Sequence, residues 1–206
     1  MNDPTTLILD GIWGRPKRFG PLRRAIEPRC GPTDVFRYNV SGMTPFETLG
    51  RLLCETIRAL DGPVNLVAFS MGGIVVRMAR LLDPDLPIRR AVFLNTPHAG
   101  TILAYALPLP GVRQMRPGSE LMRRLAEAPW DIPTMVTWCP LDAIIVPGRS
   151  AKWPKASESI CCRVPAHTWP IWSSRIHQRI AAFLGEDDAC GCESQAKQRR
   201  RELQNA

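Results

Sequence analysis

The sequence lacks any long hydrophobic segment. Its 206 residues contain no run of about twenty uncharged apolar residues, the length that a membrane-spanning helix needs. The chain leads almost at once into a strand-like segment at residues 5–9, without the basic stretch and small-residue cleavage site of a secretory signal peptide. We therefore expect a chain that neither spans a membrane nor is exported.

The sequence also lacks the even, dense cysteine spacing of a secreted disulfide scaffold. Its seven cysteines are scattered along the chain, and this favours reduced thiols in the cytoplasm. Cys161 and Cys162 are adjacent in a strand-like segment, where packing explains them better than metal or redox chemistry. Cys190 and Cys192 have no further ligand at metal-binding spacing. We expect neither a metal nor an organic cofactor.

Acidic residues are the minority among the charged ones. There are 19 of them against 27 lysines and arginines, giving a net charge of +8. Residues 186–206 hold five acidic and four basic residues, so the excess of positive charge belongs to residues 1–185. Such a body can contact anionic interfaces peripherally or can simply have a solvated basic face. The basic residues 199–201 leave a nucleic-acid arm as an alternative, but no specific nucleic-acid partner is expected.

Short apolar runs alternate with helical patterns along the chain. This alternation predicts an α/β protein with a mostly parallel sheet of about six strands and helices on both faces. The expected strands are residues 5–10, 35–40, 64–69, 91–95, 133–138 and 159–164. Residues 64–69 and 91–95 are almost continuously apolar, as in central strands covered on both faces. Functional side chains should then gather at the carboxyl ends of the strands.

Two helix starts can be read from the sequence. A capping-box pattern at residues 44–47 predicts one, and Ser173 or Ser174 can cap the last helix. After that helix the composition becomes polar and charged. We expect one catalytic domain over residues 1–185 and a polar, disordered tail over residues 186–206.

The connection at residues 97–132 is longer than an ordinary link between a strand and a helix. Its apolar start, residues 102–109, is interrupted by proline and does not suit a plain core helix. We expect a small cap over the site, at about residues 98–132. An ordinary crossover helix around residues 121–128, flanked by loops, stays open as the alternative.

Ser70 lies between the expected strand at 64–69 and a helical pattern, which is the context of a nucleophile elbow. The sharp turn leaves no room for large side chains two positions away, and Ala68 and Gly72 satisfy this limit. The Met71 amide, at the start of the helix, can donate to a developing oxyanion. The alternative is an ordinary serine-rich turn.

A serine nucleophile needs a base, and the sequence offers three histidines. In an elbow-type site the order along the chain is serine, acid, histidine. His98 precedes every suitable acid, and His177 lies inside the last helix. His167 follows the last expected strand in a loop and is the predicted base. His98 either lines the pocket or has a structural hydrogen-bonding role.

The base needs an anion that fixes its tautomer, and Asp142 is the predicted one. It follows the expected strand at 133–138, at the edge where it can reach His167. Asp131 precedes that strand and should lie at the opposite edge. A plain turn role for Asp142, after Pro140, is the alternative.

The second oxyanion donor should come from the glycine-containing loop at residues 10–14. The Ile12 amide is our first candidate and the Trp13 amide the second. Together with the Met71 amide it would supply the pair of donors that acyl transfer requires.

With these residues in place, the chain resembles the lipase and esterase branch of the α/β-hydrolase superfamily. It is most similar to the small bacterial triacylglycerol lipase/esterase group and is also similar to the lipase-like domains of GPI-inositol deacylases. The matching segments lie within residues 5–185. They are Asp10-Gly11-Ile12-Trp13-Gly14, Phe69-Ser70-Met71-Gly72-Gly73, Asn95-Thr96-Pro97-His98-Ala99-Gly100-Thr101, and Leu141-Asp142-Ala143-Ile144-Ile145-Val146-Pro147 followed by Ala166-His167. In addition, Arg116-Pro117-Gly118-Ser119-Glu120-Leu121 resembles the group's cap.

Two positions depart from the family pattern. The family usually has Gly-His-Ser where this chain has Ala68-Phe69-Ser70, and His-Gly where this chain has Asp10-Gly11. A carboxylate at position 10 would oppose negative charge on the substrate unless a cation such as Arg15 pairs with it, so activity could be reduced.

The resemblance and the residues together predict a serine hydrolase that cleaves carboxylic esters through an acyl-enzyme. A small-molecule or lipid ester is the expected substrate. An acyltransferase or thioesterase with the same three residues is the enzyme alternative. A catalytically silent binding domain on the same fold is the alternative from another class, and Asp10 encourages it.

Overall fold

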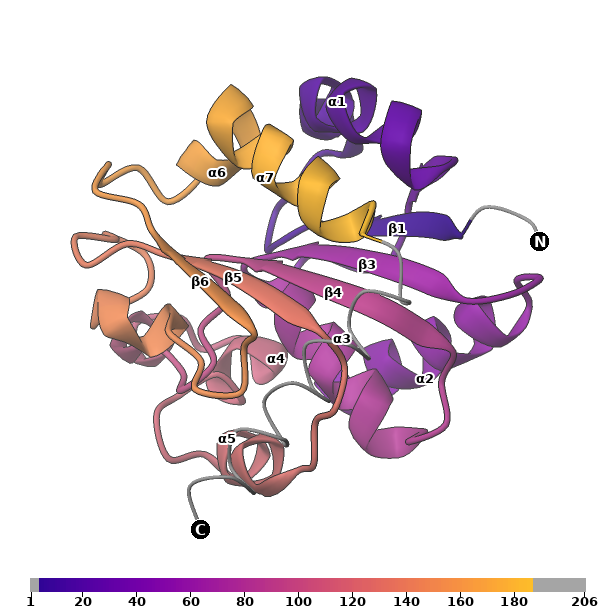
Figure 1. Cartoon of the computed structure of the whole chain (residues 1–206). Coiled ribbons are helices and arrows are strands. Elements are labelled where there is room, and N and C mark those ends of the chain that lie inside the picture. Colours follow the sequence, from indigo (N-terminus) through magenta and orange to yellow (C-terminus); the bar gives the residue numbers. More distant parts are fainter. Residues whose placement is uncertain (1–3, 187–206) are drawn as a thin grey trace, which may run out of the picture.

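Six parallel strands form one sheet at the centre of the molecule (Figure 1). The structure is a computed structural model and describes residues 4–186. The strand order is β2-β1-β3-β4-β5-β6. The bounds are β1 Thr5–Leu9, β2 Thr33–Val35, β3 Val64–Phe69, β4 Ile88–Leu94, β5 Thr134–Trp138 and β6 Glu158–Cys161. The predicted parallel α/β sheet is confirmed.

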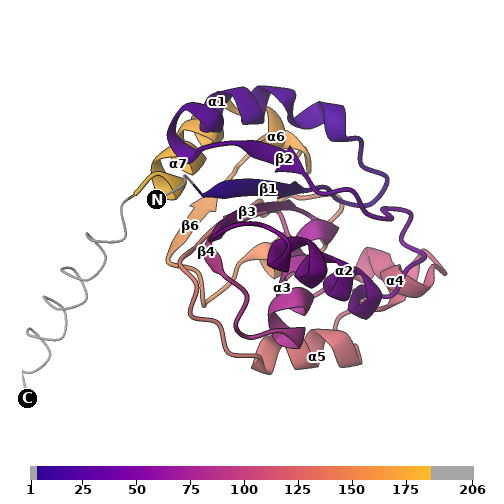
Figure 2. The ribbon, with the colours of Figure 1, turned by 90° about the vertical axis from the view of Figure 1, so that its right-hand side faces the viewer.

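Helices cover both faces of the sheet, as the layered view of Figure 2 shows. One face carries α1 Gly20–Cys30, α6 Trp169–Trp172 and α7 Ser174–Leu184 (Figure 1). The other carries α2 Phe46–Arg58, α3 Met71–Leu82, α4 Pro110–Arg113 and α5 Glu120–Glu127. Three short 3-10 helices are η1 Pro16–Phe19, η2 Ile102–Tyr105 and η3 Gly148–Ala151.

The core consists of two apolar layers, one on each side of the sheet. Successive strand side chains point to opposite faces, so a central strand with helices on both sides must be apolar throughout. Ile8, Val67 and Val92 pack with α1 and α7, whereas Leu66 and Phe93 pack with α2 and α3. All five are fully buried. This arrangement explains the apolar runs at residues 66–69 of β3 and 91–94 of β4.

The second strand begins and ends earlier than predicted, at Thr33–Val35 instead of 35–40. The Phe36 amide still donates to the Ile8 carbonyl at 2.9 Å, but beyond it the chain leaves β1. The side chains of Phe36, Tyr38 and Val40 nevertheless pack against the α2–α3 layer. The alternating pattern therefore predicted correctly which side chains are buried. The backbone at 37–40 is not a strand, and the Val40 carbonyl accepts from the Trp13 amide in the loop after β1. The last strand also ends early, at Cys161 instead of 164.

The predicted capping box at residues 44–47 is wrong. Helix α2 begins at Phe46, its N-cap residue is Pro45, and no side-chain cap comes from the cap residue itself. The Phe46 amide donates instead to the Gln114 side-chain oxygen at 2.9 Å, from a residue 68 positions further along the chain. At α7 the cap is Ser173, whose hydroxyl accepts from the Ile176 amide. Helix α2 is thus capped by a side chain from a distant part of the chain, whereas α7 has the local serine cap that the sequence predicts.

Within residues 4–186, no helix is long and apolar enough to cross a membrane. The predicted tail lies outside the described residues except for Glu186, as do Cys190, Cys192 and the basic residues 199–201. The cysteines at 30, 54, 139, 161 and 162 are described, and all are free thiols.

Candidate active site

Ser70 occupies a strained turn between β3 and α3. Its backbone has φ 52° and ψ −120°, a conformation that non-glycine residues rarely adopt. The Ser70 amide donates to the Leu94 carbonyl at 2.8 Å and ties the turn to β4. A Cβ atom on Gly72 would lie 2.6 Å from the Asp10 carbonyl oxygen, so position 72 has no room for a side chain. The sequence therefore folds locally into the elbow that its small residues predict.

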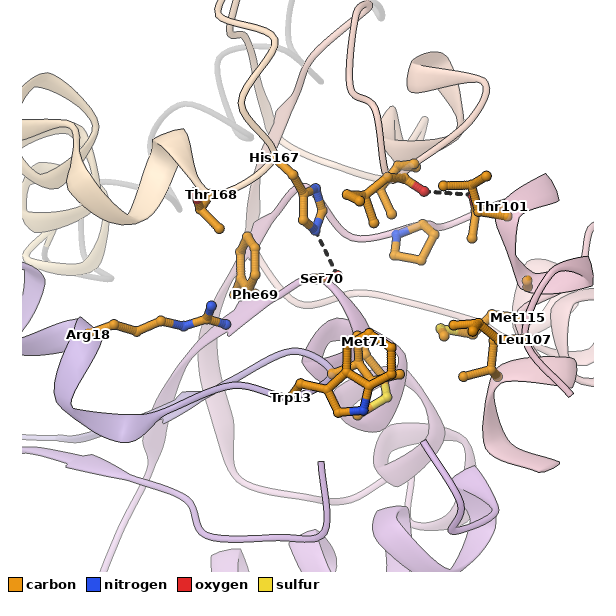
Figure 3. A pocket seen from close by; sticks show the side chains of 17 residues that line it. Trp13, Arg18, Phe69, Ser70, Met71, Thr101, Leu107, Met115, His167 and Thr168 are labelled. Atoms are coloured by element: carbon orange, nitrogen blue, oxygen red, sulfur yellow. Dashed lines mark hydrogen bonds between the residues drawn. The ribbon is translucent and has the colours of Figure 1, made fainter. Parts of the chain in front are cut away.

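The structure brings Ser70, His167 and Asp142 together at the carboxyl ends of the strands. His167 Nε2 lies 3.0 Å from Ser70 Oγ (Figure 3). His167 Nδ1 lies 2.7 Å from Asp142 Oδ2. The Asp142 carboxylate is fully buried, and the His167 ring is 11% exposed. A hydroxyl, an imidazole and a carboxylate thus form one hydrogen-bonded chain, and the serine at its start lines a cavity.

Asp142 is held as an anion. One carboxylate oxygen accepts from the backbone amides of Ile144 and Ile145 at 2.8 and 3.0 Å. Burial acts to raise the pKa of Asp142, but the hydrogen bond and charge of His167, together with the two amides, outweigh it and lower that pKa. A carboxylate that stays ionised keeps the Nδ1 proton of His167 in place and leaves Nε2 free to accept.

Asn95 is a site residue that the sequence reasoning missed. Its side-chain amide donates to the His167 carbonyl at 2.9 Å and to Asp142 Oδ2 at 3.3 Å. Its own amide oxygen accepts from the Thr137 hydroxyl at 3.0 Å. Asn95 directly follows β4 and has φ 47°, so the same carboxyl-end rule that selected Asp142 applies to it. Asn95 thus connects Asp142 to the backbone of His167 through contacts that do not involve the imidazole ring.

The amides of Met71 and Ile12 are the predicted oxyanion donors, and both residues line one cavity with Ser70. Neither amide donates to any acceptor in the described part of the chain. The Trp13 amide, our second candidate, donates to the Val40 carbonyl at 2.8 Å. That bond occupies it, so the loop leaves Ile12 as the better-placed donor.

The predicted partner of Asp10 is wrong by three positions. The Asp10 carboxylate forms an ion pair with Arg18 and not with Arg15. The residues at 16–19 form η1, and this helical turn brings Arg18 back toward β1. The carboxylate also accepts from the Gly11 amide at 2.6 Å.

A cavity of about 270 Å³ opens above Ser70 and is lined mainly by apolar side chains. In Figure 3, Arg18 and Phe69 lie on one side of His167, and Leu107 and Met115 lie on the other side of the cavity. Residues of η2, of α4 and of the segments that follow them form this second wall, whereas α5 packs against α3. The apolar side chains that line the cavity include Leu103, Leu107, Val112, Met115, Ile144 and Ile145.

The other histidines and the rejected aspartate lie elsewhere. His98 is buried outside the cavity and stacks on Trp153 with ring centroids 4.7 Å apart, so it has a structural role. His177 Nε2 lies 2.8 Å from the Ile171 carbonyl within the α6–α7 region. Asp131 pairs with Arg80 at 2.9 Å on the surface, before β5, at the opposite edge of the sheet as predicted.

Solved structures similar to this one include lipases. A monoacylglycerol lipase from Paleococcus ferrophilus superposes with a TM-score of 0.68 at 16% identity, over 90% of this chain and 96% of that one. The mature lipase BlEst2 from Bacillus licheniformis gives 0.65 at 14% identity, over 82% and 90%. The phospholipase PlaB from Legionella pneumophila gives 0.58 at 16% identity over 66% of this chain, which spans only 37% of that protein.

No protein-family model matches the sequence, and no curated protein matches it. At these identities the structural likeness shows the fold, and the chain has the α/β-hydrolase fold that its sequence predicts. The likeness to the lipase-like domains of GPI-inositol deacylases stays a prediction.

Proposed function

On this fold, we propose that the chain is a carboxylic ester hydrolase of the lipase/esterase type. The observation that carries the proposal is the unbroken chain of hydrogen bonds from Ser70 through His167 to Asp142, at the floor of an apolar cavity. A serine becomes nucleophilic only when a base accepts its proton, and this arrangement supplies both the base and the anion that orients it.

The proposed reaction is a double displacement. Ser70 Oγ attacks the ester carbonyl carbon while its proton passes to His167 Nε2. The tetrahedral intermediate collapses, its bond to the leaving oxygen breaks, and His167 returns the proton to the departing alcohol. Water then attacks the acyl-enzyme with the same proton transfers and releases a carboxylic acid. Asp142 stays ionised throughout and stabilises the imidazolium.

The Met71 and Ile12 amides would stabilise the oxyanion. Met71 opens α3, and an amide at a helix start carries partial positive charge from the helix dipole. Ile12 lies in the loop after β1, across the elbow. Each such donor contributes roughly 3 kcal/mol to transition-state stabilisation.

The cavity supports an apolar acyl group as the part of the substrate that binds. Its 270 Å³ is close to the lower end of the range of about 300–1,000 Å³ that is usual for small-molecule sites. Of the cap expected at residues 98–132, residues 98–115 would cover the cavity, because the lining residues of that segment lie between Thr101 and Met115. Trp13, Leu103 and Ile144 line the cavity and are also exposed, so the mouth can rest on a lipid surface. The free cysteines support a cytoplasmic location.

The test compares wild type with Ser70→Ala in turnover of p-nitrophenyl esters and in labelling by a fluorophosphonate. Ser174→Ala is the matched control, because Ser174 is exposed on α7 and does not line the cavity. We expect Ser70→Ala to lose both signals and the control to keep them. Unchanged ester turnover in Ser70→Ala would rule out the assignment.

The same assay separates the alternatives. A silent binding domain would leave Ser70 unlabelled in the wild type. An acyltransferase would pass the acyl group to an added alcohol or thiol in preference to water, and product analysis detects that partition.

A further inference from the structure

The loop that carries Ile12 is built around a buried carboxylate. Asp10 is 3% exposed, and one of its oxygens accepts from the Gly11 amide at 2.6 Å. The Gly14 amide donates back to the Gly11 carbonyl at 3.1 Å and closes a turn. A Cβ atom on Gly14 would overlap the Asp10 carboxylate, so the turn closes directly over it. The carboxylate therefore fills the inside of the turn.

The backbone of Asp10 is fixed as firmly as its side chain. The Tyr38 hydroxyl donates to the Asp10 carbonyl oxygen. Burial raises the pKa of Tyr38, so the hydroxyl keeps the proton that it donates. The same carbonyl lies against Gly72 in the first turn of α3. Asp10 thus links the loop after β1 to the helix whose first amide, that of Met71, is the other proposed oxyanion donor.

Arg18 places the compensating cation on the wall of the cavity. Its guanidinium pairs with the Asp10 carboxylate and lies 4.8 Å from the centre of the Phe69 ring. The Phe69 ring in turn lies 4.8 Å from the His167 ring, and Figure 3 shows Arg18 reaching toward Phe69. The ion pair at this wall has no net charge, whereas the Asp10 carboxylate alone would leave a buried charge next to the loop of Ile12.

We propose that Asp10 and Arg18 act together as positioning residues for the oxyanion hole. The Asp10 carboxylate holds residues 11–14 so that the Ile12 amide points at the substrate oxygen. The Arg18 guanidinium cancels the negative charge that would otherwise oppose the oxyanion. This inference rests on the proposed function, because it assigns a role to groups around the same serine.

Charge matching gives the proposal a distinctive signature in three variants, Arg18→Met, Asp10→Asn and the double variant. Arg18→Met leaves an unpaired, buried carboxylate inside the loop that carries Ile12, and we expect kcat to fall about 100-fold, the size of a lost oxyanion donor, with KM nearly unchanged. The double variant should recover to within about tenfold of wild type, because a neutral carboxamide at position 10 needs no counter-charge and its oxygen still accepts from the Gly11 amide.

The design separates positioning from simple support of the fold. All variants are compared by circular dichroism and by chemical denaturation, and kcat is measured only under conditions where each is folded. Arg51→Met removes an exposed cation paired with Glu47 on α2 and is the control, with wild-type kcat expected. If Arg18→Met does not fold, Arg18→Lys retains the charge, and we expect it to keep kcat within about tenfold, since the cation and not the fork geometry is required.

The outcomes are distinct. Loss of kcat in Arg18→Met with recovery in the double variant supports the proposal. A double variant as slow as Arg18→Met, or an Arg18→Met enzyme as fast as wild type, overturns the role of the pair while leaving the ester hydrolase intact. A wild-type chain that neither turns over esters nor reacts with fluorophosphonate overturns both proposals.

Discussion

Two histidines in this molecule lie at carboxyl ends of strands and have charged neighbours, yet they have opposite environments. His167 bonds to the Asp142 carboxylate and faces a cavity. His98 is buried under aromatic rings, and the Arg77 guanidinium lies 3.4 Å from its Nδ1. The first arrangement pairs the ring with an anion, whereas the second places a cation beside it.

The His98 region is a packed structural cluster. Burial, together with the positive charge of Arg77, lowers the pKa of His98 well below its usual value. Arg77 is itself buried, which lowers its pKa to about 10. It donates to the carbonyls of His98 and Leu125, the second of which is in the last turn of α5. A histidine can therefore act as a base when one ring nitrogen bonds to an anion and the other faces a cavity. It has a packing role when its charged neighbour is a cation and its ring is buried.

The largest effect that should separate the two regions is on catalysis. His167→Gln should lower kcat by about 10⁴-fold or more, because the serine loses its base, with little change in the free energy of unfolding. His98→Gln should do the reverse, with kcat within a few-fold of wild type and a loss of about 1–3 kcal/mol in stability. Ester kinetics and urea unfolding on both variants check this, and a catalytic defect in His98→Gln would remove the distinction.

A smaller effect concerns Arg77. Arg77→Met should destabilise the protein by about 2 kcal/mol, because the buried carbonyls of His98 and Leu125 lose their donor. Removal of the desolvated charge offsets part of that loss. Since Arg77 does not line the cavity, kcat should stay within about twofold of wild type, a smaller change than for any oxyanion donor. Chemical denaturation alongside ester kinetics measures both quantities. A fall in kcat well beyond twofold would mean that the cluster around Arg77 also affects the candidate active site.

The smallest effect is a pH dependence of stability. The pKa of His98 is lowered in the folded state, so below pH 6.5 the unfolded chain binds a proton that the folded chain does not. Stability is therefore unaffected by His98 above that pH and falls below it, and His177, whose pKa is lowered mainly by burial, adds to the loss. Between pH 7.5 and 5.5, His98→Gln should lose about 1 kcal/mol less than wild type in denaturant titrations. Equal losses would contradict the buried, neutral state.

Sequence reasoning located the residues of the candidate site because they follow strands. Ser70 directly follows a predicted strand, Asp142 and His167 lie in the loops that follow two others, and parallel strands bring their carboxyl ends to one edge. His98 also follows a strand, so the same rule could not tell pocket from core. Only the packing of Trp153 over its ring decides that.

What the sequence could not supply are contacts between side chains that are distant along the chain. Asn95 reaches His167 across 72 positions, and Gln114 caps α2 across 68. Arg18 rather than Arg15 pairs with Asp10 because η1 turns the chain back, and spacing alone cannot show that reach. Each of these contacts depends on how the loops pack, and the hydrophobic periodicity of strands and helices does not determine loop packing.

The backbone of Ser70 has a consequence for the stability of the fold. Holding a serine at φ 52° and ψ −120° costs on the order of 1–3 kcal/mol, which glycine would avoid. The strained turn therefore lowers the free energy of unfolding, and at that expense it places a hydroxyl group where glycine would place none.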